Sequence, residues 1–199
     1  MSNPILTLLR DKNIDKKEFR RLSDLLAEQL ASKSIDLVKK TTKEIETPHA
    51  KITREVTKDP FIIIILRSAL AMLPSFMKFY PNSSVYFFGI YREQTTTNPI
   101  LYYKKLPETI SKDQQVFILD PMLATGKTTS YAVNELKKIG CQEENICLFS
   151  MVGAKQGVNF INKSHPKLHL EIVEVDPHLN SKMEIVPGLG DFGDRYFGS

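Results

Sequence analysis

Apolar residues are distributed along the chain in a pattern that predicts a sheet covered on both faces. Runs of mainly aliphatic and aromatic residues recur in KDPFIIIIL, SSVYFFGI, QQVFILD, NICLFSMV and KLHLEIVEV. Such runs are typical of strands buried on both sides of a parallel sheet. Segments with helical character stand between several of them, in SALAMLPSFMKF, TTSYAVNELKKIG and AKQGVNFINKSH. The alternation from residue 61 to 175 predicts an α/β protein with a doubly wound, mainly parallel sheet.

A long helix is predicted near the N-terminus. Asp15 can cap it, and Glu18, three residues later, completes a capping box. Ile14 can pack on the first apolar residue of the helix. Apolar residues then recur at helical spacing, at Phe19, Leu22, Leu25, Leu26 and Leu30. We therefore expect residues 1–58 to form an N-terminal helical segment of a single domain that covers residues 1–199.

Two stretches interrupt the alternation. Residues 91–109, YREQTTTNPILYYKKLPET, are too many for a tight turn and favour strands, so we expect an extended hairpin or flap at one edge of the sheet. Residues 176–199, DPHLNSKMEIVPGLGDFGDRYFGS, are rich in glycine, which argues against a regular helix. They form either a compact hood over a ligand or a loose tail.

Composition narrows the class of protein. The chain has 199 residues, of which 42% are hydrophobic and 25% charged, as is ordinary for a globular protein. No apolar run is long enough to span a membrane and no secretory signal is recognisable, so we expect a cytoplasmic protein. Cys141 and Cys147 lack the spacing of a zinc site or disulfide framework and are expected to be reduced. The net charge of +4 comes from interleaved signs, which gives no support for nucleic-acid binding.

The strongest chemical signal is the loop VFILDPMLATGKTTSYAV. Its letters Gly126-Lys127-Thr128 are those that end an ATP-binding P-loop. A P-loop also requires a glycine five positions earlier, where this chain has Pro121. Proline has no N–H to donate to a phosphate, so a P-loop kinase is disfavoured.

The same loop fits a simpler anion site. A buried strand delivers Asp120 to its C-terminal end, a turn exposes backbone amides, and a helix is expected to begin at Thr128 or Thr129. The N-terminus of a helix carries about half a positive charge, so amides and hydroxyls there can surround a terminal phosphate. Because a carboxylate repels phosphate, Asp120 is expected to face a sugar hydroxyl or a metal ion, unless it only caps the following turn.

LDPMLATG, followed by Lys127 and Thr128, resembles the phosphoribosyl-pyrophosphate loop of uracil phosphoribosyltransferases. In that family, proline replaces the second of two acidic residues that most type I phosphoribosyltransferases carry there. ILRSALAM, GIYREQTTTNPILYYKKLP and VPGLGDFGDRYFGS resemble further stretches of the family in the same order, and DKNIDKKEFRRL extends the likeness toward the N-terminus. The resemblance therefore covers nearly the whole chain and implies a type I phosphoribosyltransferase-like fold.

The resemblance also implies a reaction. Uracil and 5-phosphoribosyl diphosphate would give UMP and pyrophosphate, a step of pyrimidine salvage. Displacement at the ribose C1 passes through an oxocarbenium-like transition state, so the protein mainly positions both substrates and stabilises the departing pyrophosphate. The resemblance further implies Mg²⁺, bound mainly through the diphosphate substrate, and a homodimer or higher homo-oligomer. It implies no partner among nucleic acids or membranes.

Site roles are carried over by the same resemblance. The catalytic residues would be Arg67, Asp120 and Asp191, and no dedicated set of protein metal ligands is expected. The residues expected to bind phosphoribosyl diphosphate are Arg67, Arg92, Asp120, Pro121, Met122, Leu123, Ala124, Thr125, Gly126, Lys127, Thr128 and Asp191. Those expected to bind uracil are Ile185, Gly190, Asp191 and Phe192.

The two arginines in this set have a plainer interpretation. Without the resemblance, Arg67 and Arg92 are better read as surface salt-bridge partners. With it, their forked, permanently charged guanidinium groups are expected to hold pyrophosphate.

The chain departs from the family pattern at four positions. Lys127, Ala69 and Ala71 stand where relatives commonly have glycine, and a positive φ at Lys127 would cost about 1 kcal/mol. Phe192 stands where a small residue is usual, and it would either stack on the base or narrow the pocket. These departures leave an alternative open, a catalytically weak nucleotide-binding homologue with a sensing or regulatory role.

Overall fold

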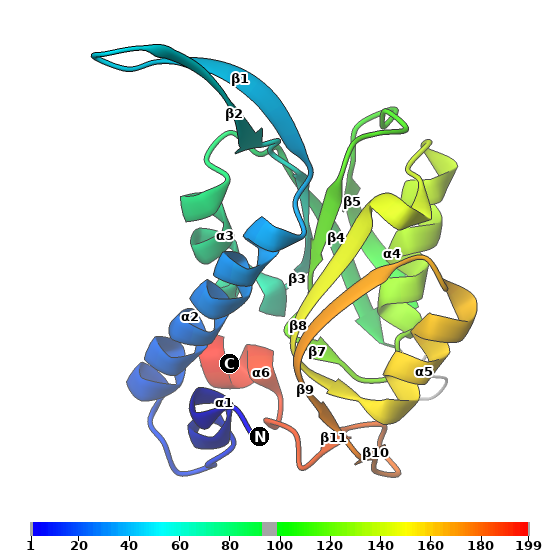
Figure 1. Cartoon of the computed structure of the whole chain (residues 1–199). Coiled ribbons are helices and arrows are strands. Elements are labelled where there is room, and N and C mark those ends of the chain that lie inside the picture. The colour runs from blue at the N-terminus through cyan, green and yellow to red at the C-terminus, as the bar shows by residue number, and fades with distance from the viewer. Residues whose placement is uncertain (1, 93–98, 199) are drawn as a thin grey trace.

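The computed structural model describes residues 2–92 and 99–198, without the side chain of Arg92. Its main sheet is built from β3 (Phe61–Leu66), β4 (Val85–Arg92), β5 (Pro99–Lys105), β6 (Val116–Leu119), β7 (Met122–Leu123), β8 (Ile146–Ala154) and β9 (His169–Asp176). The strand order is β5-β4-β3-β6-β8-β7, and β9 pairs with β8 (Figure 1). The pairs are parallel except that of β4 with β5. The prediction of a mainly parallel α/β sheet is confirmed.

Helices cover both faces of this sheet (Figure 1). One face carries α1 (Pro4–Leu9), α2 (Lys16–Lys33), α3 (Leu73–Phe79) and α6 (Phe192–Phe197), and the other carries α4 (Lys127–Lys138) and α5 (Lys155–Ser164). Three 3-10 turns, η1 (Ser34–Asp36), η2 (Ser68–Ala71) and η3 (Glu143–Asn145), connect the elements. No helix in this described part of the chain is long and apolar enough to cross a membrane.

Alternation along the strands explains the two layers. Ile62 and Ile64 of β3 pack into the core beneath α2, whereas Ile63 and Ile65 pack into the core beneath α4. Successive side chains of a strand point to opposite faces, so a continuous apolar run must be covered on both.

The Asp15 cap of helix α2 is confirmed, whereas Glu18, expected to complete a capping box, pairs with Arg21 instead. The Asp15 side chain accepts a hydrogen bond from the backbone N–H of Glu18 at 2.7 Å. The Glu18 carboxylate turns to Arg21, with N···O distances of 2.6 and 2.8 Å. Of the predicted apolar stripe, Leu25 is 38% exposed, whereas Phe19, Leu22, Leu26 and Leu30 are buried.

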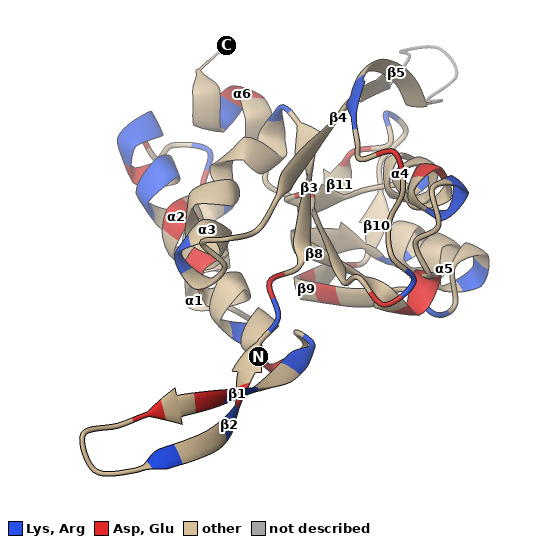
Figure 2. Cartoon of the chain, turned by 90° about the horizontal axis from the view of Figure 1, so that it is seen from above, with Lys and Arg blue, Asp and Glu red and all other residues tan. Residues whose placement is uncertain are grey.

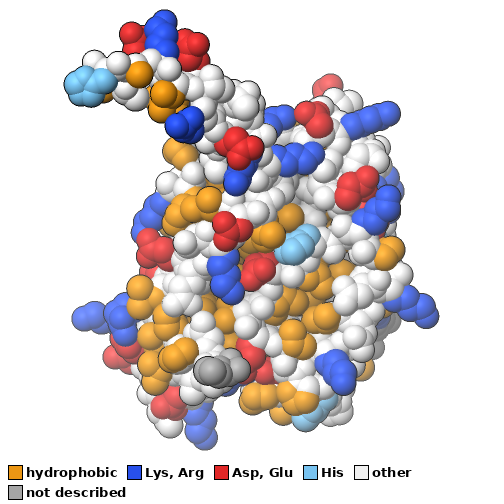
Figure 3. Space-filling model, in the orientation of Figure 1, with side chains coloured by type: hydrophobic (Ala, Val, Ile, Leu, Met, Phe, Trp, Pro, Cys, Tyr) orange, Lys and Arg blue, Asp and Glu red, His pale blue; other side chains and the backbone are white. Residues whose placement is uncertain are grey.

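Residues 40–57 correct the expectation that residues 1–58 form a helical segment. They form an antiparallel hairpin of β1 (Lys40–Glu46) and β2 (Lys51–Thr57), which we call the arm. The arm projects from the body, and every residue of β1 is exposed (Figures 1 and 3). Both signs of charge interleave along the arm and along α2 (Figure 2). The arm has isolated apolar residues, Ile45, Ile52 and Val56, and no stripe that would bury a helix.

The two irregular stretches are also resolved in part. β4 and β5 form an antiparallel hairpin at one edge of the sheet, with a register shift between Gly89 and Ile90. The hairpin expected within residues 91–109 thus begins earlier, because its first strand is β4, and its tip at 93–98 lies outside the described residues. The segment 176–199, described as far as 198, is compact, and we call it the hood. It contains a short hairpin of β10 (His178–Leu179) and β11 (Ile185–Val186). The expectation that it holds no regular helix is wrong at α6, where Asp191 caps the first turn.

Both cysteines are free and buried. Burial raises the pKa of Cys141 and of Cys147 to about 11. The reactive thiolate is therefore scarce at neutral pH, as expected for structural cysteines.

An aromatic cluster in the core sets the first test of the fold. Phe149 is fully buried, with its ring centroid 4.8 Å from that of Phe117 and 5.0 Å from that of Phe76. Phe149→Ala is expected to lower the free energy of unfolding by about 3–5 kcal/mol, because it leaves a cavity. The matched control is Phe160→Ala at a side chain that is 40% exposed, with an expected loss below about 1 kcal/mol. Denaturant titration measures both, and equal losses would contradict this packing.

Candidate active site

The cleft lies where the strand order reverses direction. From β3 the chain continues to β4 on one side and then returns to β6 on the other. β3 and β6 are parallel neighbours, with Ile64 opposite Leu119, so both end at the same edge of the sheet. Arg67 directly follows β3, and Asp120 directly follows β6. In open α/β sheets, ligands bind outside the carboxyl ends of strands at such a switch point.

A cleft of about 1160 Å³ opens at this edge. It brings together most of the predicted site residues, namely Asp120, Met122, Leu123, Ala124, Thr125, Gly126, Thr128, Ile185, Gly190, Asp191 and Phe192. Pro121 and Lys127 are not among its lining residues. The loop after β6 and the hood thus face one common space.

The loop after β6 is anchored to β8 through its backbone. The Ser150 hydroxyl donates to the carbonyl of Asp120 at 2.6 Å. The carbonyl of Pro121 accepts from the backbone N–H groups of Met151 and Val152 at 3.0 and 3.1 Å. Asp120 itself is 9% exposed, and its Oδ1 accepts from the N–H of Met122 at 3.4 Å. Pro121 therefore contributes a fixed turn behind the cleft, because its ring leaves only the carbonyl for bonding.

Helix α4 points its N-terminus at the cleft. Gly126 has a left-handed φ of 79° and precedes Lys127, which is already the first helical residue. The expected start at Thr128 or Thr129 is thus wrong by one or two residues. Thr125 and Thr128 line the cleft beside this helix end. The arrangement supplies the dipole, amides and hydroxyls that suit a phosphate.

The sequence analysis did not predict a role for Gly157, which lets the loop after β6 lie against α5. A Cβ at this position would lie 2.2 Å from the carbonyl oxygen of Ala124 and 3.1 Å from that of Leu123. The only signal in the sequence was a glycine inside a predicted helix, which marks a close backbone approach. Gly157 therefore fixes the distance between α5 and the loop.

Thr129 was also missed as a cleft residue. It lines the cleft and is 1% exposed, and its Oγ1 is buried without a hydrogen-bond partner within the described structure.

Arg67 lies in a smaller cleft of about 310 Å³ that adjoins the first and shares Leu66, Ser68, Ile90, Asp191 and Gly193 with it. Its Nη2 is 2.9 Å from Oδ1 of Asp194, and its guanidinium lies 5.6 Å from the Phe197 ring centroid. Both members of the Arg67–Asp194 pair are about half exposed, with side-chain exposures of 51% and 54%. Exposed pairs stabilise by only about 0–1 kcal/mol, so a multiply charged anion can displace Asp194. The predicted partner side chain, that of Arg92, lies outside the described residues.

The hood forms the opposite wall. Ile185 and Asp191 line the cleft, and the Asp191 Oδ1 accepts from the N–H of Asp194 at 2.9 Å. Phe192 is 2% exposed, with its ring 5.4 Å from the Phe19 ring and stacked at 5.8 Å on Tyr196. Phe192 is the first residue of α6, and its ring packs into the core against α2. Stacking this ring on a base would therefore require moving α6.

Comparison with known proteins agrees with this geometry. Residues 2–199 match the family described as uracil phosphoribosyltransferase. The chain belongs to the uracil phosphoribosyltransferase family. A uracil phosphoribosyltransferase of Limosilactobacillus reuteri (strain DSM 20016) is 40% identical over 200 residues, covering 98% of this chain and 92% of the relative.

Solved structures show the fold. A protein from Aquifex aeolicus matches with a TM-score of 0.88 at 30% identity, covering 99% of this chain and 96% of that chain. The APRTase of Giardia lamblia complexed with 9-deazaadenine matches with a TM-score of 0.54 at 13% identity, covering 79% of this chain and 81% of that chain. The second likeness shows the fold alone, and the fold is that of the type I phosphoribosyltransferases.

The departures from the uracil phosphoribosyltransferase pattern can now be located. The positive φ belongs to Gly126, so the expected strain at Lys127 is absent. Ala69 and Ala71 belong to η2 and are buried in the core, with exposures of 0% and 3%.

The phosphoribosyltransferase family generally uses Mg²⁺ with its diphosphate substrate, and the donor set of the cleft fits that ion. In residues 2–92 and 99–198, no group of three or more His, Cys, Asp or Glu is placed to hold a metal. Asp120 and Asp191 both line the cleft, and Mg²⁺ is usually bound by one or two carboxylates together with substrate phosphates.

Gly157→Ala is expected to push α5 away from the loop after β6. Calorimetry with ribose 5-phosphate is expected to show binding weakened on the order of 10- to 100-fold, because small displacements of positioning groups are costly. Gln156→Ala, at the exposed neighbouring position on α5, is the matched control and should change the affinity less than about twofold. Equal affinities of Gly157→Ala and the unsubstituted protein would contradict this role.

Proposed function

We propose that this chain transfers the 5-phosphoribosyl group from phosphoribosyl diphosphate to uracil, giving UMP and pyrophosphate in pyrimidine salvage. The observation that carries this proposal is a single cleft in a chain of this family, which joins an anion-binding loop, a strand-end carboxylate and the hood. The loop suits the sugar phosphate, and the hood suits the base.

The phosphoribosyl half occupies the sheet side of the cleft. Backbone amides from Ala124 to Thr128 and the end of α4 bind the 5-phosphate. Asp120 accepts hydrogen bonds from ribose hydroxyls, which keeps its charge away from the phosphate. Arg67 leaves Asp194 and, with Arg92, holds the pyrophosphate through forked hydrogen bonds. Holding the reactants in this geometry and stabilising the leaving group are the main sources of rate.

The uracil half faces the hood. One edge of uracil presents an acceptor, a donor and an acceptor, and the backbone around Ile185 and Gly190 can match it. Gly190 is exposed in the cleft wall, and Ile185 is buried at 5%. A matched edge rejects cytosine, because its amino group would bring a donor against a buried donor.

Mg²⁺ belongs to the diphosphate substrate in this proposal, and the protein contributes no dedicated metal cage. When bound, the ion neutralises charge on the diphosphate and its leaving group. Asp191, and Asp120 if it turns from the ribose, are the residues that would contact it. We also propose that the enzyme works in the cytosol, a reducing compartment that suits its two free thiols.

The alternative, a weak nucleotide-binding homologue, gains no support from the departures. Lys127 is helical, and the Phe192 ring packs against the rings of Phe19 and Tyr196.

The arm supports a homo-oligomer. An isolated two-stranded hairpin is marginal in water, and residues of this arm are exposed along both strands. We propose that a second copy of the chain packs against Ile45 and Ile52, which lie opposite each other, so that the enzyme is a homodimer or a higher homo-oligomer.

Two substitutions test the transferase. Asp120→Asn removes the ribose acceptor charge and Arg67→Ala removes a pyrophosphate contact, so each is expected to lower kcat/KM on the order of 10²- to 10³-fold. The assay follows UMP formation from uracil, phosphoribosyl diphosphate and Mg²⁺.

Asp36→Asn and Arg21→Ala, exposed and outside both the residues that line the cleft and the arm, are the matched controls and should retain full activity. Cytosine and orotate serve as competing bases, and cytosine is expected to be discriminated against on the order of 10⁴-fold. UMP binding without any turnover by the unsubstituted protein would favour the weak homologue instead.

Residues 41–56 of the arm can be replaced by a short Gly-Ser turn. The shortened chain is expected to be a monomer, whereas the full chain is expected to form a dimer or a higher oligomer. Analytical ultracentrifugation measures this directly. A full chain that sediments at 22.7 kDa, the mass of one copy, would refute the homo-oligomer.

A further inference from the structure

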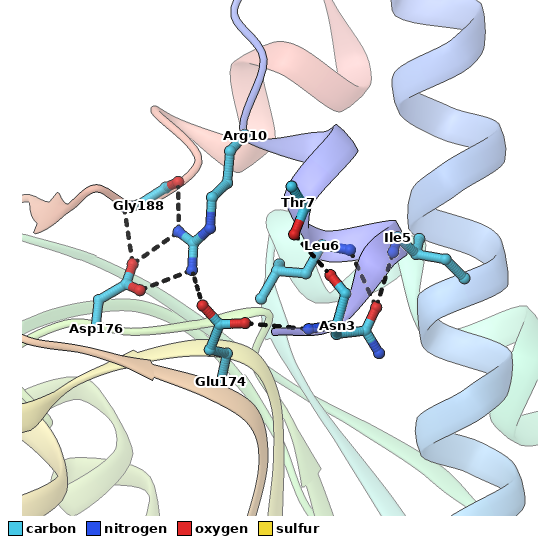
Figure 4. Close-up of polar contacts among 8 residues, drawn as sticks. All are labelled: Asn3, Ile5, Leu6, Thr7, Arg10, Glu174, Asp176 and Gly188. Carbon is cyan, nitrogen blue, oxygen red and sulfur yellow. Dashed lines mark hydrogen bonds and ion pairs between the residues drawn. The ribbon is translucent and has the colours of Figure 1, made fainter. Parts of the chain in front are cut away.

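A partly buried ion cluster of Arg10, Glu174 and Asp176 joins the N-terminal helix to the hood (Figure 4). Arg10 follows the last residue of α1 and makes two hydrogen bonds to Asp176, Nη1 to Oδ2 at 2.9 Å and Nη2 to Oδ1 at 2.7 Å. Its Nη2 also lies 2.9 Å from Glu174 Oε1, and its Nη1 donates to the carbonyl of Gly188 at 2.9 Å. Glu174 and Asp176 are two residues apart on β9, so they point to the same face of the sheet.

Glu174 contacts both ends of α1, whereas Asp176 contacts only the end that carries Arg10. Asn3 caps the helix by accepting from the N–H groups of Ile5 and Leu6, and its own N–H donates to Glu174 Oε2 at 3.3 Å. The helix is therefore fixed on β9 in one position along its axis, with Arg10 at the end nearest the hood.

The cluster is largely removed from solvent. The side chain of Arg10 is 17% exposed and that of Asp176 is 3% exposed. Burial alone would lower the pKa of Arg10, but its hydrogen bonds to Asp176 and Glu174 outweigh burial and raise that pKa. Removing one member of such a pair leaves the other charge buried without compensation, which is strongly unfavourable.

Both backbone polar groups of Gly188 are hydrogen-bonded to the cluster. Its N–H donates to Asp176 Oδ2 at 2.8 Å, while its carbonyl accepts from Arg10. Its φ is +61°, and a Cβ there would lie 2.1 Å from the carbonyl oxygen of Ile185, so the turn admits only glycine. Pro187, directly before it, and Gly190, two residues after it, line the cleft, whereas Gly188 does not. The cluster thus holds the cleft wall from behind.

A second arginine fastens the same junction from the other side. Arg195 of α6 donates from Nη1 to the carbonyls of Leu9 and Leu189, each at 2.8 Å, and from Nη2 to that of Asp11 at 2.6 Å. Its guanidinium lies 4.2 Å from the Phe19 ring centroid. The carbonyls on either side of Arg10 are therefore bound by an arginine of the hood, while Arg10 binds a carbonyl of the hood.

From this reciprocal arrangement we infer that Arg10 is a positioning residue for base binding, acting through the backbone of the turn at Gly188. It does not line the cleft, and its effect reaches the base through the wall formed by residues 185–191. This inference rests on the proposed function for its kinetic consequence. Its structural consequence, a turn that loosens when the guanidinium is removed, is independent of that function.

The test compares Arg10→Met and Arg10→Lys with Lys33→Met. Lys33 also links the N-terminal half to β9, through an exposed pair with Glu171 at 3.3 Å, so it is a matched control without contact to the hood. Arg10→Met is expected to raise KM for uracil about tenfold, the factor that one charge-assisted hydrogen bond represents, while KM for phosphoribosyl diphosphate changes less than about twofold. Arg10→Lys keeps the positive charge but loses the forked donor geometry, so its KM for uracil should lie between those of Arg10→Met and the unsubstituted protein.

Amide hydrogen exchange on the same proteins supplies a readout that does not depend on catalysis. Exchange is expected to rise in residues 185–191 of Arg10→Met and to stay unchanged at residues 124–128, with no change at either place in Lys33→Met. If Arg10→Met does not fold, Arg10→Lys carries the comparison. Unchanged exchange at 185–191, or equal increases in both KM values, would overturn the inference. If the unsubstituted protein is inactive with uracil, the proposed function is refuted. Amide hydrogen exchange at residues 185–191 then still decides whether Arg10 positions the turn.

Discussion

The parallel pairing of β3 with β6 is the interaction on which the rest of the structure depends. Ile62 to Ile64 and Phe117 to Leu119 lie side by side with helices on both faces, which removes both strands from water. Because a parallel pair ends at one edge, the first polar residues after each apolar run are brought together there. Arg67 and Asp120 are those residues, and the cleft is a consequence of where the apolar runs stop.

This explains how much of the fold and the site could be predicted. A buried strand has a strong apolar signature, so the sheet, the helices between its strands and the loop after β6 could all be inferred from the sequence. The arm could not, because a hairpin exposed on both faces has neither an apolar stripe nor a buried run. Residues 192–197 were not predicted as a helix because Gly193 within them, and Gly190 and Gly198 on either side, outweigh the Asp191 cap in a local sequence pattern.

The same distinction applies to individual site residues. The position of Asp120 in the cleft could be predicted because Asp120 directly follows a buried strand in the sequence. Gly157 could not be assigned a function, because the atom that requires it belongs to Ala124, on another element. The departures at Lys127 and Phe192 concern backbone and ring orientation, which only the folded chain decides. Lys127 falls inside a helix, and Phe192 turns toward α2.

The junction between α1 and the hood has a consequence for the order in which the molecule can form during synthesis. Arg10 and Gly188 are 178 positions apart, so Arg10 leaves the ribosome long before its partners exist. Until β9 and the hood emerge, its guanidinium must remain hydrated and α1 has nothing to dock against. A nascent chain can therefore assemble the sheet and the loop after β6 first, and the cleft is completed only when the two distant ends of the chain meet.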